Sequence, residues 1–331
     1  MRAAAVQLNS TDDKDRNMAT ADRLTREAAA DGADLVVLPE KFNVLGEHDD
    51  YVAGAEPLDG PTISWACDTA RELGLPLPPA RMPRRQRLRP LKRWRYVGVF
   101  GPEVQLCAGD ARIGPAPVRW WAIAEPGRPL REGKRGIALS PGKVGVDDGD
   151  VEIRLDLDER EPVETATAYG RSFAWTAKQA DVPARGTVRI DGRVLDIDAR
   201  AVVDVSAGYH PRHTAWTWSA GVGSLADGRS VGWNLVTGIH DSPRSSERTI
   251  WVDGEAMEAD PVSFADDLAG IRFADGAQLR FDQWAAREDR TNLLLMRSYY
   301  RQPFGTFAGE LPGGLRLAEG YGVMEEHEVW W

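Results

Sequence analysis

Apolar positions in the first 75 residues alternate between strand-like runs and helix-like spacing. Residues 3–8 and 34–38 are short apolar runs of the kind that form buried strands, and the second run stops at a proline. Between them, residues 14–31 place apolar side chains three or four positions apart, which predicts an amphipathic helix. A second helix is expected over residues 61–73, with proline in its first turn and glycine just beyond its end. The pattern predicts a β-α-β unit followed by a helix.

The rest of the chain consists of short apolar or alternating runs that are typical of β-strands. Asp-Gly pairs, which favour tight hairpin turns, begin at positions 148, 191, 227, 253 and 275. One helix is expected among these runs, over residues 260–268. The fold class is therefore α+β, with a β-α-β-α segment followed by a large antiparallel all-β barrel or sandwich. The expected strands are residues 144–146, 151–157, 173–176, 186–190, 214–218, 230–236, 248–252, 271–273 and 279–281.

The composition is that of a folded protein in a reducing compartment. Of the 331 residues, 42% are hydrophobic and 28% are charged, which excludes global disorder, and the length suggests two domains. No apolar run approaches the ~20 residues of a membrane span, and the first residues lack a secretory cleavage pattern. Two cysteines, Cys67 and Cys107, are too few for a disulfide framework or a cysteine-built zinc site. We expect a cytoplasmic protein without a membrane span.

Charge is distributed unevenly along the chain. Residues 1–75 carry 7 basic and 15 acidic side chains, whereas residues 76–96 carry eight basic side chains, no acidic one and five prolines. This change predicts a domain of residues 1–75, a basic linker or extension of residues 76–96, and a β-rich domain of residues 97–331. The net charge of −10 argues against nucleic-acid binding. We interpret the basic run as lying against the protein's own acidic surface, with docking to an acidic partner or a membrane surface as the alternative.

Residues 36–40 (Val-Val-Leu-Pro-Glu) and 4–8 (Ala-Ala-Val-Gln-Leu), with the helix between them, resemble the start of the nitrilase, or carbon-nitrogen hydrolase, superfamily. The resemblance implies that Glu40 is the general base of a Glu-Lys-Cys triad. Such a carboxylate could deprotonate a cysteine that attacks an amide or nitrile carbon. No later segment continues the family's pattern, so we expect Glu40 to lack its partners. Cys107 is interpreted as a buried thiol rather than the nucleophile.

A second resemblance extends over essentially the whole of residues 76–331. It is to a bacterial family known as the domain of unknown function 2804, and it implies a large lipocalin-like (calycin) double barrel, similar to relatives of hydroxyneurosporene hydratase and tocopherol cyclase. No tested activity comes with it. The segments that carry it are residues 92–99, 169–176, 208–214, 231–235, 300–307, 311–314 and 322–327.

Several polar and aromatic residues of this region are candidates for ligand binding. His210 and His213 have an H-x-x-H spacing, but a strand would point the two rings to opposite faces, so a metal site is not favoured. His240 precedes an aspartate and could act as an acid or base, or cap an ordinary turn. Residues 325–327 (Glu-Glu-His) are interpreted as part of a closing strand. The full candidate set is Tyr209, His210, His213, Trp216, Trp218, Trp233, His240 and Arg301.

Three functions are consistent with these observations. The favoured hypothesis is a cytoplasmic β-barrel that binds, and could transform, a hydrophobic small molecule, and that carries a catalytically incomplete nitrilase-like segment. The alternatives are a carbon-nitrogen hydrolase that acts through Glu40, and a non-enzymatic interaction module that uses the basic linker. No cofactor is expected, because no glycine-rich phosphate loop was found. Neither the oligomeric state nor the origin of the N-terminal segment, by fusion or by frameshift, follows from the sequence.

Overall fold

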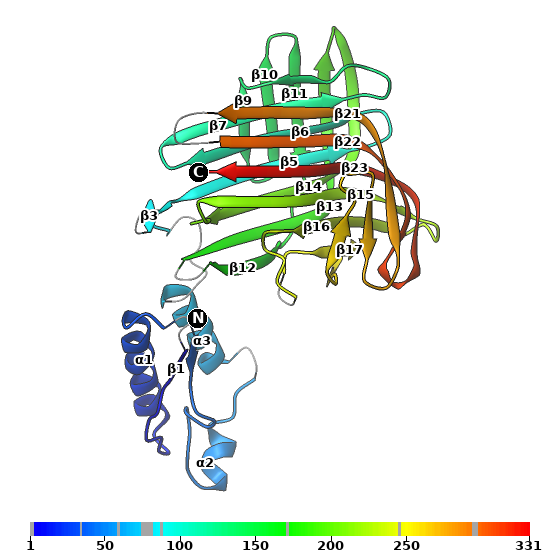
Figure 1. The fold of residues 1–331 in the computed structure, drawn as a ribbon. Helices are drawn as coiled ribbons and strands as arrows, with labels where there is room; N and C mark the ends of the chain where they lie inside the picture. Colours follow the sequence, from blue (N-terminus) through cyan, green and yellow to red (C-terminus); the bar gives the residue numbers. More distant parts are fainter. Residues whose placement is uncertain are drawn as a thin grey trace. The chain divides into compact units, whose positions relative to one another are not determined.

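The computed structural model describes residues 3–33, 35–57, 60–73, 82–86, 89–169, 172–243, 246–292 and 297–331 (Figure 1). The chain forms two compact units. The first contains residues 1–82 and 168–173, and the second, the β domain, contains residues 83–167 and 174–331. Of the expected linker, residues 76–81 and 87–88 lie outside the described residues.

The first unit contains the predicted β-α-β arrangement. Its two short strands pair in parallel, and the long helix between them is capped by Asp13, whose side chain accepts a hydrogen bond from the backbone nitrogen of Arg16 at 3.0 Å. None of the described helices is long and apolar enough to cross a membrane. The helix expected over residues 61–73 is confirmed, and a short helix that the sequence did not predict precedes it. The elements are β1 (Ala3–Ala5), α1 (Lys14–Ala30), β2 (Leu35–Val37), α2 (His48–Ala53) and α3 (Pro61–Leu73).

The β domain begins with a small hairpin and a ten-stranded sheet. Neighbouring strands along the path of this sheet pair in antiparallel fashion, as predicted. The path is β8-β7-β6-β5-β14-β13-β11-β10-β9, and β12 pairs with β13. The strands are β3 (Arg85–Gln86), β4 (Arg89–Pro90), β5 (Lys92–Phe100), β6 (Gln105–Ile113), β7 (Ala116–Ala124), β8 (Arg131–Gly133), β9 (Ile137–Ser140), β10 (Lys143–Asp148), β11 (Val151–Leu157), β12 (Val163–Tyr169), β13 (Ser172–Ile190) and β14 (Arg193–Gly208).

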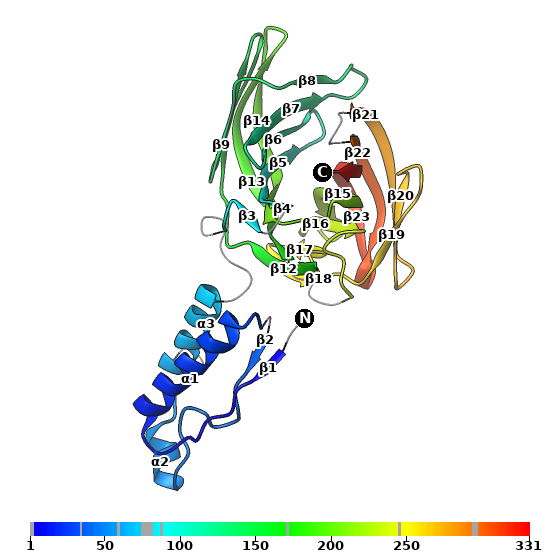
Figure 2. The same ribbon diagram turned by 60° about the vertical axis from the view of Figure 1, so that its left-hand side comes forward.

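The nine-stranded second sheet follows it along the chain and is also antiparallel. Its order is β18-β17-β16-β15-β23-β22-β21-β20-β19. Figure 2 shows the two curved sheets of the β domain facing each other. The strands are β15 (His213–Leu225), β16 (Ser230–Thr237), β17 (Thr249–Val252), β18 (Glu255–Glu258), β19 (Val262–Phe264), β20 (Gly270–Phe273), β21 (Gln278–Asn292), β22 (Arg297–Leu311) and β23 (Leu315–Trp330).

Two local expectations differ from the structure. The helix expected over residues 260–268 is wrong: residues 262–264 form β19, with Val262 buried and Ser263 exposed, because pairing with β20 imposes the period of a strand. Residues 92–96, which the sequence assigned to the linker, form the first half of β5 and lie in the middle of the first sheet. Arg93 and Arg95 lie on one face of that strand, and Lys92, Trp94 and Tyr96 lie on the other.

Each sheet curls around a hydrophobic core of its own. In two of the long strands, a bulge separates the part that packs into this core from the part that does not. In β13 a register shift between Gln179 and Val182 moves the alternation to the opposite face, so that Val182 enters the first core. A shift between Gln283 and Ala285 does the same in β21. The other ends of these strands are therefore free to face the opposite sheet.

Gly232 of β16 lies where the second sheet meets the bulge of β13. A Cβ atom at this position would lie 2.7 Å from the Cβ of Ala180 and 2.9 Å from the backbone nitrogen of Asp181. We therefore expect Gly232→Ala to lower the free energy of unfolding by about 1–3 kcal/mol, because the two sheets would have to move apart. Gly145→Ala in β10 is the control, since its Cβ would meet no atom nearer than 3.5 Å. Urea unfolding followed by tryptophan fluorescence measures both variants, and equal losses would contradict the explanation.

Candidate functional site

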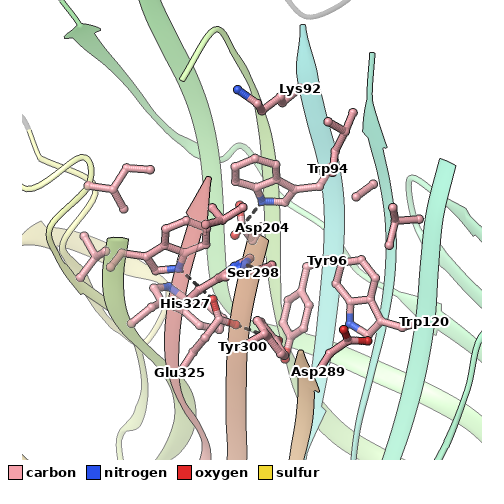
Figure 3. Close-up of a pocket in the computed structure, with 18 of the residues that line it drawn as sticks. Lys92, Trp94, Tyr96, Trp120, Asp204, Asp289, Ser298, Tyr300, Glu325 and His327 are labelled. Carbon is pink, nitrogen blue, oxygen red and sulfur yellow. Dashed lines mark hydrogen bonds between the residues drawn. The ribbon is translucent and has the colours of Figure 1, made fainter. Parts of the chain in front are cut away.

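A cavity of about 280 Å³ lies between the two sheets of the β domain (Figure 3). Its walls come from β5, β6, β7, β13 and β14 of the first sheet and from β15, β16, β21, β22 and β23 of the second. Large aromatic side chains supply much of its apolar surface. They are Trp94, Tyr96, Trp120, Trp216, Trp218, Tyr300 and Trp331.

Strand alternation determines which residues reach the cavity. On β5, Lys92, Trp94 and Tyr96 face it, whereas Val97 and Val99 pack into the core of the first sheet. Figure 3 shows the first three in a row along one strand. The second sheet follows the same rule on β23, where the residues that line the cavity are Glu325, His327 and Val329.

Lys178, Asp204 and Glu247 form a buried cluster of charged groups in the cavity wall. Lys178 on β13 and Asp204 on β14 are direct cross-strand neighbours, and the lysine Nζ lies 2.8 Å from the aspartate Oδ1. Glu247, just before β17, places its Oε2 3.4 Å from the same Nζ. The lysine side chain is only 4% exposed, and Trp94 Nε1 donates to the other aspartate oxygen at 3.3 Å. One ammonium is thus shared by two carboxyl groups away from bulk water.

This cluster is suited to hold a proton. Burial raises the pKa values of Asp204 and Glu247, and the charge of Glu247 adds to the rise at Asp204 while Lys178 opposes it. Burial on its own lowers the pKa of Lys178, but the two carboxylates outweigh it and the pKa lies above its usual value. Two carboxylates and one ammonium carry a net charge of −1, which is costly in a medium of low dielectric constant. The cluster therefore favours uptake of one proton and can act as a general acid, then as a general base.

The backbone of Glu247 is fixed by a hydrogen-bonded chain from the second sheet. Asn234 Nδ2 donates to the Glu247 carbonyl oxygen at 2.8 Å, and Trp218 Nε1 donates to Asn234 Oδ1 at 2.8 Å. Asn234 is fully buried on β16, so its amide is satisfied by these two neighbours. Trp218 therefore both lines the cavity and positions the segment that carries the carboxyl group.

Glu325 on β23 is a second buried carboxyl group in the cavity wall. It accepts hydrogen bonds from Trp216 Nε1 at 2.8 Å, from the Tyr300 hydroxyl at 2.9 Å and from Gln302 Nε2 at 3.0 Å. Burial raises the pKa of Glu325 to about 7, although the donors from Trp216 and Tyr300 oppose the rise. A carboxyl group that titrates near neutral pH can release or accept a proton during a reaction.

Two buried histidines, His210 and His240, and the half-buried His327 lie around the cavity and are uncharged at neutral pH. Burial lowers the pKa values of His327 and His240 to about 3 and that of His210 well below its usual value. The Ser298 hydroxyl is hydrogen-bonded to His327 Nε2 at 2.9 Å, and the Thr167 hydroxyl to His240 Nδ1 at 2.9 Å. Neutral imidazole rings can orient a polar group of a ligand without adding charge.

The structure brings three of the sequence-derived ligand candidates together at the cavity. Trp216, Trp218 and His240 all line it. Trp233 lies instead in the core of the second sheet, where it is fully buried and its Nε1 donates to the Ser219 hydroxyl at 3.1 Å. Its neighbours on the same face of β16 belong to that core as well, which accounts for its placement.

Tyr209 and His210 are buried near the cavity but are not among its lining residues. The Tyr209 hydroxyl donates to the carbonyl oxygen of Pro83 at 2.6 Å. The His210 ring stacks on the lining residue Trp94, with ring centroids 5.3 Å apart. His210 thus supports one wall of the cavity from behind.

His213 and Arg301 are placed away from the cavity lining. His213 is exposed, and its Nε2 lies 3.0 Å from Glu328 Oε1. Arg301 Nη2 donates to Gln283 Oε1 at 2.7 Å. His210 is buried and His213 is exposed, so the two rings of the H-x-x-H spacing do not share one environment.

Glu40 and Cys107, the two residues considered for carbon-nitrogen hydrolysis, have unfavourable surroundings for that chemistry. Glu40 is exposed in a turn, without the desolvation that would strengthen a general base. Cys107 is fully buried in β6, its Sγ donates to Gln302 Oε1 at 3.6 Å, and burial raises the pKa of the thiol to about 12. A protonated, buried thiol is a poor nucleophile, so these surroundings agree with the interpretation of Cys107 as a buried thiol rather than the nucleophile.

Lys178 and Glu247 were not among the residues predicted from the sequence, and Glu325 was interpreted as structural. A usable signal exists for Lys178, which interrupts the otherwise small and apolar run of residues 173–178 (Phe-Ala-Trp-Thr-Ala-Lys). A lone charge in a buried strand requires a partner of opposite charge. For Glu247 no comparable pattern exists, because it precedes its strand by two residues and meets Lys178 only through the fold.

Sequence comparisons divide the chain into two parts. The carbon-nitrogen hydrolase model matches residues 2–78, and the model of the domain of unknown function DUF2804 matches residues 128–331. The omega-amidase NIT2 of Danio rerio is 31% identical over 142 residues, which are 43% of this chain and 48% of that protein. The deaminated glutathione amidase of Bos taurus is 40% identical over 73 residues, which are 22% of each chain. The chain thus spans about half the length, or less, of these curated relatives.

Solved structures resemble the chain in fold at low sequence identity. Kievitone hydratase from Nectria haematococca gives a TM-score of 0.50 at 12% identity, over 70% of this chain and 88% of that one. A protein of Nitrosomonas europaea described as AttH gives 0.47 at 13% identity, over 71% and 91%. The likeness to kievitone hydratase shows a shared fold and agrees with the large β domain described above.

Proposed function

The chain belongs to the DUF2804 family, and we propose that its β domain binds a small, mainly apolar molecule between the two sheets and exchanges a proton with it. The observation that carries the proposal is the cluster of Lys178, Asp204 and Glu247 in the wall of an otherwise aromatic cavity. An apolar cavity with a few convergent polar groups of perturbed pKa is the usual form of a small-molecule site.

The volume of the cavity indicates the size of the ligand, and the lining side chains indicate its chemistry. A volume of about 280 Å³ lies close to the lower end of the roughly 300–1,000 Å³ that small-molecule sites usually have, and so suits a small organic molecule. Indole and phenol rings on both sheets offer flat apolar surfaces. The ligand therefore has an apolar body, and it has at least one oxygen-bearing or unsaturated position that can meet Asp204 or Glu325.

The chemistry that fits these groups is proton transfer. A protonated carboxyl group can donate to a hydroxyl or an alkene, and the carboxylate so formed can take back a proton from a neighbouring carbon. Addition or loss of water and migration of a double bond are reactions of this kind. Burial strengthens each electrostatic interaction in the cavity, which favours a site of fixed polar groups over bulk water.

Native mass spectrometry of the full chain, followed by organic extraction and identification of whatever accompanies the 36.4 kDa protein, tests the binding proposal directly. The compound is then titrated back and followed by tryptophan fluorescence, because four tryptophans line the cavity in addition to Trp331. Saturable quenching is expected. Emission that no extracted or added apolar compound alters would contradict a ligand site between the sheets.

Asp204→Asn separates binding from proton transfer. We expect the variant to bind the extracted compound about as well as the native chain, but to incorporate solvent deuterium into it about 100-fold more slowly, since the asparagine cannot exchange a proton. Asp198→Asn is the control, because Asp198 is an exposed residue of the same strand. Deuterium incorporation is measured by mass spectrometry of the ligand in heavy water. Equal rates in both variants would remove the role of Asp204.

A further inference from the structure

Lys92 is a buried ammonium in the cavity wall that has no acidic partner among the described residues. Its side chain is 1% exposed at the start of β5. The Nζ atom donates to the carbonyl oxygen of His210 at 3.3 Å and lies 4.6 Å from the ring centre of Trp331. A lysine has three N–H donors, so one carbonyl oxygen leaves donor capacity unused.

The other cationic residues that line the cavity are each paired with a carboxylate. The Nζ of Lys134 lies 3.1 Å from Asp289, and a nitrogen of Arg287 lies 3.2 Å from Glu132. Lys178 has the two carboxyl groups described above. Lys92 differs from all three because it has no carboxylate partner. A buried, unpaired ammonium destabilises the folded chain, and a bound anion would remove that destabilisation.

The electrostatic surroundings of Lys92 favour an anion. Burial lowers the pKa of Lys92 to about 8, and the charge of Arg89 lowers it further. Lys92 and Arg89 also contribute to the low pKa of His210. This end of the cavity therefore carries an excess of positive charge, whereas the carboxyl groups of the cavity occupy other strands.

From this arrangement we propose that the ligand is an amphipathic monoanion whose carboxylate binds the Lys92 ammonium. The inference rests on the proposed function and adds the class of substrate. One ammonium matches one negative charge, which suits a carboxylate better than a doubly charged phosphate, for which several donors are usual.

Strand geometry sets the distance between the charged end of this ligand and the acid–base group. Lys92 is the cross-strand partner of Gly208, whereas Asp204 is the partner of Tyr96, so Lys92 and Asp204 lie four strand positions, or about 13 Å, apart. Trp94 lies between them, and its Nε1 donates to Asp204. Figure 3 shows Lys92, Trp94 and Asp204 in that sequence along the cavity. A carboxylate at Lys92 thus places the carbon about 13 Å further along the ligand beside Asp204, with the indole of Trp94 against the chain between them.

Two matched pairs of probes test the proposal: 4-phenylbutyrate with 4-phenylbutan-1-ol, and decanoate with 1-decanol. Isothermal titration calorimetry of the full chain measures the affinity of each. We expect at least one acid to bind roughly 10- to 100-fold more tightly than its alcohol, as a charge-assisted hydrogen bond at a buried site allows. Lys92→Met should abolish this preference and Lys92→Arg should retain it. Lys143→Met, which removes an exposed lysine of β10, is the control and should leave it unchanged.

The outcomes separate this inference from the proposed function. Equal binding of acid and alcohol to the native chain would overturn the anion site while supporting an apolar ligand. An acid preference that survives in Lys92→Met would place the anion elsewhere and would also overturn it. Binding of none of the four probes would count against the ligand site as a whole, and with it the role of Lys92. Thermal unfolding of each variant shows that the fold is retained.

Discussion

Lys178→Met is expected to lower the free energy of unfolding by about 3–5 kcal/mol at neutral pH. The substitution keeps the volume of the side chain but leaves Asp204 and Glu247 facing each other without a cation. Removing one partner of a buried ion pair costs far more than the pair itself contributes, because an uncompensated charge remains in a medium of low dielectric constant. Urea unfolding at pH 7, followed by tryptophan fluorescence, measures the loss.

The stability that Lys178→Met loses should be larger at high pH than at low pH. Burial already raises the pKa values of Asp204 and Glu247, and without Lys178 the largest interaction that opposes that rise is lost. The folded variant then binds more protons than the unfolded chain above the ordinary carboxyl pKa values, so its stability falls as pH rises and recovers as pH falls. The deficit relative to the native chain should therefore be smaller at pH 5 than at pH 8. Lys143→Met should show neither the loss nor this trend.

A compensating variant distinguishes uncompensated charge from poor packing. Adding Asp204→Asn and Glu247→Gln to Lys178→Met removes both carboxylates that the lysine neutralised. If charge is the cause, the triple variant should regain a large part of the lost stability. If the triple variant is no more stable than Lys178→Met alone, packing of the methionine is responsible and the electrostatic account of the cluster fails.

The parts of the fold that the sequence predicted are those determined locally. The helix over residues 61–73 begins at a proline and ends before a glycine, and the sequence contains both signals. The hairpin between β13 and β14 likewise has its Asp-Gly turn at residues 191–192. The pairing of β14 with β5 joins Gly208 to Lys92, which are more than a hundred residues apart, and no local pattern indicates it. Residues 92–96 were assigned to the linker because their basic side chains continue the basic run of residues 76–96.

The candidate site was only partly predictable for the same reason. Alternation alone places Trp216 and Trp218 on one face of a strand, and both line the cavity. The acid–base cluster depends on register between strands, since Asp204 meets Lys178 across β13 and β14. The bulge beside Gln179 also decides that Lys178 faces the cavity while Val182 faces the core. No sequence pattern in this strand predicts a bulge of one residue.

Glu325 should make the stability of the native chain fall as pH rises through neutrality. Its pKa in the folded chain is about 7, against an ordinary glutamate pKa of 4.5. Between these pH values the folded chain holds a proton that the unfolded chain has lost, so this group stabilises fully below about pH 4.5 and the stabilisation is lost as pH passes 7. This difference in the pKa of Glu325 corresponds to about 3 kcal/mol in the free energy of unfolding.

Glu325→Gln isolates this contribution from that of other groups. His240 and His327, whose pKa values are lowered in the folded chain, act in the opposite direction, because the unfolded chain binds protons at its histidines below their ordinary pKa while the folded chain does not. The stability difference between the native chain and Glu325→Gln cancels their effect, and between pH 5 and pH 8 it should change by about 3 kcal/mol in favour of the glutamine variant. Glu326→Gln, the next residue of β23 and therefore on its opposite face, is the control and should give a constant difference.

Parallel stability curves for the native chain and Glu325→Gln would show that Glu325 keeps one protonation state throughout. Glu325 would then lose its place as a second acid–base group, and Asp204 and Glu247 would be left as the proton-exchanging groups of the cavity.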